Sequence, residues 1–237
     1  MPMRLIAASL LLLLATPAVG QTCPDFMTTA RRLVVVTALD MNATVAMLQT
    51  FVRVRGKGKW AKRSQPIDIV IGKAGMAWWV PFAGTPPEGE PKKTEGDKRT
   101  PAGFFQLGRT FGTGKSGRVD YLRLRKDRHI CVDDLNSKLY GRIVPRSQAG
   151  ANISGEDMWA EPLYKRGIII EASVSREAKS GSCIFMHVRD PDGSGTSGCV
   201  AMGEREVEKL QEWVSGGDAV IAILPEAARA RFAACLP

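Results

Sequence analysis

The chain has 237 residues, of which 44% are hydrophobic and 24% are charged, a composition typical of a globular protein with one sizeable core. It carries 33 Lys and Arg residues against 24 Asp and Glu residues, a formal net charge of +9. This charge suits an acidic partner such as nucleic acid, anionic lipid or a cell-wall polymer that bears carboxylates. The alternative is a soluble basic surface without a specific partner.

The N-terminal segment, residues 1–20, has the features of a secretory signal peptide. Arg4 supplies a positive charge, residues 5–15 are almost entirely apolar, and Ala18-Val19-Gly20 forms a small-x-small cleavage site. The apolar run is far shorter than the roughly 20 residues of a membrane span, and no other stretch is long enough to span a bilayer. We therefore expect an exported protein of the periplasm or cell envelope, which argues against a nucleic-acid partner and leaves no integral span after cleavage.

Export favours disulfide formation, and the chain has an odd number of cysteines, five. Cys23 and Cys235 lie near the two ends of the mature chain, and chain termini are often close in space. We predict a bridge between them and a second one between Cys131 and Cys183, although four cysteines allow three pairings. Cys199 is then the leftover thiol.

Most of the mature chain predicts short strands rich in Val, Ile, Phe and Trp and bounded by turn residues. The expected strands cover residues 31–38, 46–55, 66–72, 76–82, 104–108, 166–173, 182–188 and 218–224.

Two helices are expected besides these strands. Residues 204–214 place Val207, Leu210 and Val214 on one stripe, with acidic residues early, and the tail PEAARARFAA favours another short helix. Residues 84–103 are predicted to form a long polar loop, a kind of segment that is often functional. No repeat or linker divides the chain, so we predict a single, mainly β domain with a few helices.

The stretch HVRDPDGSGTSGCVAM, which runs from His187 to Met202, combines one of only two histidines with Cys199. An imidazole within reach of a thiol can activate it as a nucleophile and later return the proton to a leaving amine. Gly198 allows a backbone turn that aims amide groups at one point, as an oxyanion hole requires. The pattern therefore indicates a candidate cysteine acyltransferase site.

Other interpretations of these residues stay open at this stage. His187 can be a packed or surface histidine, and Cys199 can be a disulfide partner in a non-catalytic protein. A zinc site fits poorly because two histidines without a C-x-x-C pair leave too few ligands, so no metal or cofactor is expected. A thiol–disulfide oxidoreductase would also need a C-x-x-C pair.

The H-x11-C spacing resembles the active-site signature of the L,D-transpeptidase catalytic domain, also called the YkuD-type domain. Four further segments resemble the family in the right order: IDIVIGKAGMAWW, KKTEGDKRTPAGFFQLGRTFG, CVDDLNSKLYGRIV and EKLQEWVSGGDAVIAIL. The V-D-D block and the short His-to-Cys gap are similar to one branch. The resemblance implies a YkuD-type mixed β-sandwich or barrel over residues 31–226, after an N-terminal extension at 21–30 and before a C-terminal tail at 227–237.

The resemblance also implies an activity on peptidoglycan stem peptides. In such enzymes a thiolate attacks a donor tetrapeptide and releases D-alanine, and an amine or water then resolves the thioester. It implies that Cys199 is the nucleophile, that His187 is the base, and that the amides of Gly198 and Cys199 form the oxyanion hole. A carbonyl just after the histidine, that of Val188, would fix its tautomer. A hydrolytic carboxypeptidase or amidase is the close alternative.

The sequence departs from well-known members of this family at two positions. Ser197 stands where a histidine is usual, and Ala201 stands where Arg or Asn is usual. Another group must therefore bind the substrate carboxylate. Arg99 and Arg189 are the candidates, with Ser197 and Thr100 beside the cleft.

Overall fold

A computed structural model describes residues 23–54, 58–79, 87–116, 120–172, 179–214 and 217–237. The predicted signal peptide, residues 1–20, lies outside the described residues, and the predicted N-terminal extension is described only from Cys23 onward. Across the described part, no helix is long and apolar enough to cross a membrane.

The fold is built on a β-barrel whose strand order closes on itself. Eight strands follow one another around it: β1 (Arg32–Ala38), β14 (Ala219–Pro225), β6 (Thr100–Gly112), β11 (Arg166–Glu171), β12 (Phe185–Val188), β13 (Val200–Met202), β4 (Ile67–Val70) and β2 (Val45–Val52). Antiparallel pairing of β2 with β1 completes the ring. Three short strands extend this sheet: β3 (Ala61–Lys62), β5 (Met76–Trp78) and β7 (Tyr121–Arg123). The prediction of a mainly β domain with a few helices is confirmed.

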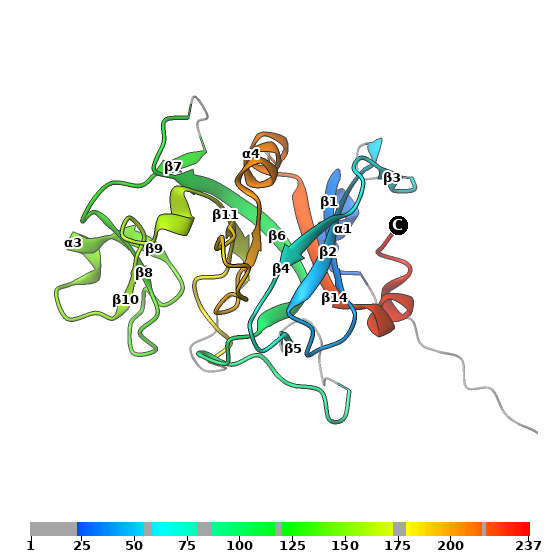
Figure 1. The fold of residues 1–237 in the computed structure, drawn as a ribbon, viewed down its shortest axis with the longest axis horizontal. Helices are drawn as coiled ribbons and strands as arrows, with labels where there is room; N and C mark the ends of the chain where they lie inside the picture. The colour runs from blue at the N-terminus through cyan, green and yellow to red at the C-terminus, as the bar shows by residue number, and fades with distance from the viewer. Residues whose placement is uncertain (1–22, 55–57, 80–86, 117–119, 173–178, 215–216) are drawn as a thin grey trace, which may run out of the picture.

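A second, three-stranded sheet lies to one side of the barrel (Figure 1). It has the order β10 (Gly155–Asp157), β8 (His129–Val132) and β9 (Ile143–Pro145), followed along the chain from β9 by the short helix α3 (Arg146–Ala149). The 3-10 helix η2 (Pro162–Lys165) leads from this sheet back into β11. A disulfide between Cys131 on β8 and Cys183 just before β12 joins the small sheet to the barrel.

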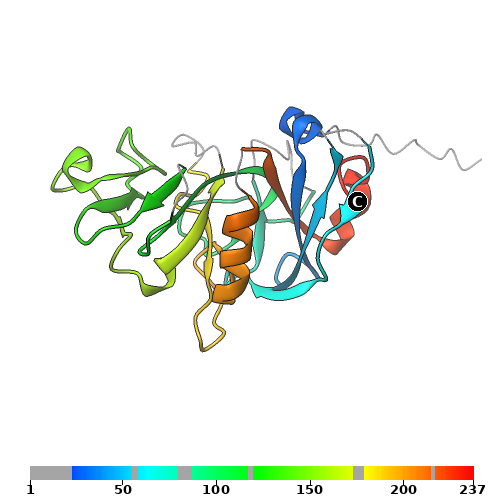
Figure 2. The same ribbon diagram turned by 90° about the horizontal axis from the view of Figure 1, so that it is seen from above.

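The barrel core is filled by strands that are apolar on both faces. All seven residues of β14 are buried, and most of β1 is buried beside it in parallel register. Helix α4 (Glu204–Trp213) contributes Val207 and Leu210 to the same core. Figure 2 shows this helix lying alongside the strands. Strands buried on both faces have continuous apolar sequences, which is why these strands could be predicted.

The two ends of the chain meet on the barrel. The helix α1 (Asp25–Thr29) follows Cys23, which forms a disulfide with Cys235 after the 3-10 helix η3 (Glu226–Phe232). Phe232 is fully buried, and its ring centroid lies 5.3 Å from that of Phe104 on β6. The segment expected to be a C-terminal tail is therefore packed into the main core.

The structure corrects several predicted boundaries. Strand β6 begins at Thr100, so the predicted loop at 84–103 gives way to a strand at its end. Strand β12 begins only at Phe185, because Cys183 has a φ of 55° that no strand residue adopts. The described part of the predicted strand 76–82 ends at Trp78. The short strands β3, β7, β8, β9, β10 and β13 were not predicted.

Candidate active site

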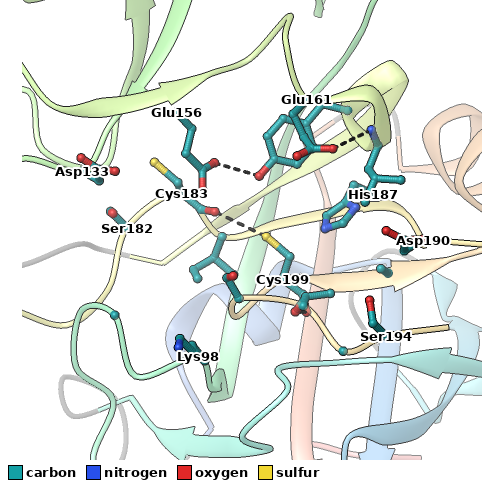
Figure 3. Close-up of a pocket in the computed structure, with 18 of the residues that line it drawn as sticks. Lys98, Asp133, Glu156, Glu161, Ser182, Cys183, His187, Asp190, Ser194 and Cys199 are labelled. Atoms are coloured by element: carbon teal, nitrogen blue, oxygen red, sulfur yellow. Dashed lines mark hydrogen bonds between the residues drawn. The ribbon is translucent and has the colours of Figure 1, made fainter. Parts of the chain in front are cut away.

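His187 and Cys199 line one cavity of about 380 Å³ between the barrel and the small sheet. Strands β12 and β13 run parallel, with His187 opposite Ala201, so Cys199 comes just before the start of β13. Figure 3 shows the imidazole and the sulfur pointing into the same space. Two residues that lie twelve positions apart are therefore brought together by strand pairing and by the loop between the strands.

The His187 side chain is 5% exposed and is fixed by the backbone of its neighbour. Its Nδ1 atom lies 2.8 Å from the carbonyl oxygen of Val188. A carbonyl oxygen can only accept a hydrogen bond, so Nδ1 carries the hydrogen and Nε2 can accept a proton. Burial lowers the pKa of His187, which keeps the imidazole neutral. This is the form that a general base requires.

The Cys199 thiol is free, 7% exposed, and has two backbone partners. The amide of Phe185 donates to the sulfur at 3.3 Å, and the thiol lies 3.5 Å from the carbonyl oxygen of Cys183, its acceptor. Figure 3 draws the second contact. Burial, with a further contribution from Glu156, raises the pKa of the Cys199 thiol to about 12.

A thiol with this pKa is protonated in the resting protein. The thiol and the imidazole are therefore both neutral at rest.

The backbone around Cys199 is held by two threonine hydroxyls. The hydroxyls of Thr100 and Thr196 both donate to the carbonyl oxygen of Cys199, at 3.2 and 2.7 Å. The Thr196 hydroxyl also accepts from the amide of Gly198 at 3.1 Å. Gly198 has a φ of 141°, and a Cβ placed there would lie 3.1 Å from the carbonyl oxygen of Arg99. Only glycine therefore fits the turn that presents the thiol.

The sequence matches the L,D-transpeptidase catalytic domain (YkuD) family over residues 48–222. The chain belongs to this family. Its assignment to the short-gap branch stays a prediction. Comparison with curated proteins finds no match.

Among solved structures, the chain is similar to the helical cell shape determining protein Pgp2 from Campylobacter jejuni, with 17% identity and a TM-score of 0.42. That match covers 86% of this chain and 52% of Pgp2. It is also similar to Bd1075 from Bdellovibrio bacteriovorus, with 15% identity and a TM-score of 0.44, covering 93% of this chain and 58% of that one. The chain thus spans little more than half the length of these proteins.

The YkuD cavity also contains a tyrosine and a carboxylate that the sequence analysis missed. Tyr164, on η2, lies against the imidazole, with ring centroids 5.3 Å apart. Its hydroxyl donates to Glu156 on β10 at 2.8 Å (Figure 3). Neither residue belongs to a motif, and Tyr164 and Glu156 lie 35 and 43 positions before Cys199. Only the packing of the small sheet on the barrel brings them to the thiol.

The charge of the cavity lining is mainly negative. Among the described residues, its acidic and basic side chains other than His187 are Lys93, Glu95, Lys98, Asp133, Glu156, Glu161 and Asp190. The ammonium group of Lys93 is buried and pairs with Asp97 at 2.7 Å. A basic protein therefore presents an acidic wall at its candidate site, which favours a substrate group that carries positive charge.

The predicted substrate-binding residues divide into two groups. Ser197 lines the cavity. Arg99 instead donates to the carbonyl oxygens of Met41 and Met76, both at 3.0 Å, and Thr100 is fully buried. Arg189 is exposed, and neither arginine is among the residues that line the cavity. Arg99 and Thr100 act on the architecture of the site because their polar groups are already bonded to the backbone.

Proposed function

We propose that this chain is an exported cysteine acyltransferase of peptidoglycan stem peptides, an L,D-transpeptidase. The observation that carries the proposal is the shared cavity of His187 and Cys199, in which Nδ1 is bound to Val188 and Nε2 can take the thiol proton. Membership of the YkuD family supports the same reaction class. The four other cysteines are paired with one another, which supports a free Cys199 over a non-catalytic, disulfide-bonded one.

The proposed reaction begins with a neutral thiol. As the sulfur of Cys199 attacks the carbonyl at the L-centre of the diamino acid in a donor tetrapeptide, its proton passes to Nε2 of His187. The imidazolium then gives this proton to the amine of the departing D-alanine, and a thioester stays on the enzyme. An amine of a second stem peptide attacks the thioester and loses its own proton to His187. The C–S bond breaks as the new amide bond forms, and the sulfur of Cys199 regains the proton from the imidazolium.

The developing oxyanion needs amide donors close to the thiol. We assign this role to the amide of Cys199, with that of Gly198 as the second donor. The Gly198 amide is bonded to the Thr196 hydroxyl in the resting protein, so it must exchange this partner for the oxyanion. The carboxylates of the cavity suit the free ammonium group of a diamino acid, whereas no arginine among the described residues lines the cavity to receive a carboxylate.

The close alternative is hydrolysis, in which water resolves the same thioester. The deciding experiment is incubation of the purified protein with disaccharide tetrapeptide, followed by mass spectrometry. Cross-linked dimers with release of D-alanine are expected, and tripeptide alone would instead indicate a carboxypeptidase. The matched control is Cys199→Ala, which should give neither product. Unchanged tetrapeptide with the wild-type protein would contradict both activities.

A further inference from the structure

Tyr164 occupies a position that packing alone does not explain. Its ring is enclosed by Phe111, Phe185 and His187, with edge-to-face contacts at 5.9, 5.4 and 5.3 Å between centroids. The side chain is almost fully buried, and its hydroxyl reaches the cavity that contains Cys199. A phenylalanine would fill the same apolar space. Packing therefore explains the ring of Tyr164 but does not explain its hydroxyl.

That hydroxyl lies between two acidic groups. It donates to a carboxylate oxygen of Glu156 at 2.8 Å, and Tyr164 packs in one buried cluster with Cys199 and lines the same cavity. A phenol has one hydrogen to donate and can accept others. In the resting protein the phenol hydrogen goes to Glu156 and the thiol hydrogen goes to the Cys183 carbonyl oxygen, so the phenol donates nothing to the sulfur.

The thiolate that forms during attack needs donors in place of water. The Phe185 amide is one donor to the sulfur. Two charged groups act on the thiol: Glu156 on β10 disfavours ionisation of Cys199, and Lys93 favours it. His187 lies on β12. The Lys93 ammonium is held by Asp97 and the Thr94 carbonyl, so it acts from a distance. The phenol is the neutral donor that can turn from the carboxylate to the sulfur.

We propose that the Tyr164 hydroxyl is a catalytic group that donates a hydrogen bond to the Cys199 thiolate as it forms. The thiol proton moves to Nε2 of His187, and the phenol keeps its own proton while its O–H rotates from Glu156 to the sulfur. No bond to the phenol oxygen is formed or broken. Glu156 then acts as the group that positions the phenol between turnovers. The role in turnover rests on the proposed function, but the effect on the thiol does not.

The test measures the thiol without any peptide substrate. Alkylation of Cys199 by iodoacetamide is followed by mass spectrometry between pH 7 and 9 in the wild type and in Tyr164→Phe. Hydrogen bonds to charged groups are strong, so the variant should react about 10-fold more slowly across this range. Tyr121→Phe is the matched control, because Tyr121 donates to the Gly114 carbonyl on another part of the barrel. Folded Tyr164→Phe that reacts as fast as wild type would overturn the proposal.

A second variant covers the case in which Tyr164→Phe does not fold. Glu156→Gln keeps an oxygen acceptor near the phenol but removes the negative charge, which frees the O–H for the sulfur. Alkylation should then become faster than in wild type, and an equal or slower rate would overturn the proposal. In the double variant the gain from Glu156→Gln should shrink, because the phenol is gone. Since no stem peptide is used, inactivity on tetrapeptide would reject the proposed function and leave this result standing.

Discussion

The thiol of Cys199 lies 3.5 Å from the carbonyl oxygen of Cys183, its hydrogen-bond acceptor, and Cys183 is itself disulfide-bonded to Cys131 on the small sheet. Cys183 also has a φ of 55°, a conformation that non-glycine residues seldom adopt. The disulfide therefore ties the small sheet, which carries Glu156, to the residue whose carbonyl accepts from the Cys199 thiol. The geometry of the site depends on this covalent link between the two sheets.

Replacing Cys131 and Cys183 together by serine should impair both stability and reactivity. The disulfide closes a loop with a sequence separation of 52 residues, which corresponds to about 4 kcal/mol of unfolding free energy in the chain-entropy account. Chemical denaturation measures this loss, and alkylation of Cys199 measures the reactivity. The control is the double serine variant of Cys23 and Cys235, which lies away from the cavity. It should lose stability and keep the alkylation rate; equal effects of both variants on alkylation would contradict the link.

His187→Ala should reduce acyl transfer to tetrapeptide by roughly 10²- to 10⁴-fold, the usual contribution of a positioned acid–base group. The measurement is the initial rate of D-alanine release. His129→Ala is the matched control, since His129 is also buried but sits on β8 and does not line the cavity. Similar losses in the two variants would point to a general folding effect and remove His187 from the base role.

The pH dependence of acyl transfer should have its acidic limb below pH 6.5. His187 must be neutral to accept the thiol proton, and burial lowers its pKa from 6.5. The base is therefore fully competent above pH 6.5, and the rate falls as pH drops through the lowered pKa. The pKa of the Cys199 thiol is about 12, so no further rise from thiol ionisation should appear between pH 7 and 9. A rate that still climbs tenfold per pH unit there would contradict the neutral-pair mechanism.

Gly198→Ala should disrupt the turn that presents the nucleophile. The φ of 141° is disfavoured for alanine, and the new Cβ would lie 3.1 Å from the Arg99 carbonyl oxygen and 3.3 Å from the Cδ1 of Ile184. Backbone strain of this kind costs about 1–3 kcal/mol, and a shifted thiol should also slow D-alanine release. Gly114→Ala, where a Cβ meets nothing within 4 Å, is the control. Wild-type stability and turnover in Gly198→Ala would show that the turn tolerates a side chain.

Thr100→Val should destabilise the loop beneath the nucleophile. The Thr100 hydroxyl is fully buried, donates to the Cys199 carbonyl oxygen and accepts from the Gly72 amide at 2.8 Å. Valine has the same shape but leaves both groups without this partner, at a cost of about 1–3 kcal/mol. Thermal and chemical unfolding measure the loss, with the exposed Thr28→Val as control. An unchanged unfolding free energy would show that other groups hold this carbonyl.

The features that could be predicted from the sequence are those set by residues close to one another in the chain. The buried strands β1 and β14 are continuous apolar runs, and the stripe of α4 repeats with helical period, so both kinds of element were found. Strands β8, β9 and β10 have only three or four residues each and carry too little pattern to be recognised. The start of β6 was missed because Thr100 and Pro101 look like the polar loop before them.

The proposed nucleophile and base could be predicted because they share one short motif around a single loop. The sequence by itself determined the residue types, their order and the family, because the cysteine, the histidine and the glycine that indicate this chemistry lie within one short segment. Tertiary structure alone decided which groups surround the thiol. It brought Tyr164 and Glu156 to the sulfur, turned Arg99 toward backbone carbonyls and made the thiol neutral. Burial and long-range packing set these properties, and neither can be predicted from the residues next to a given position in the chain.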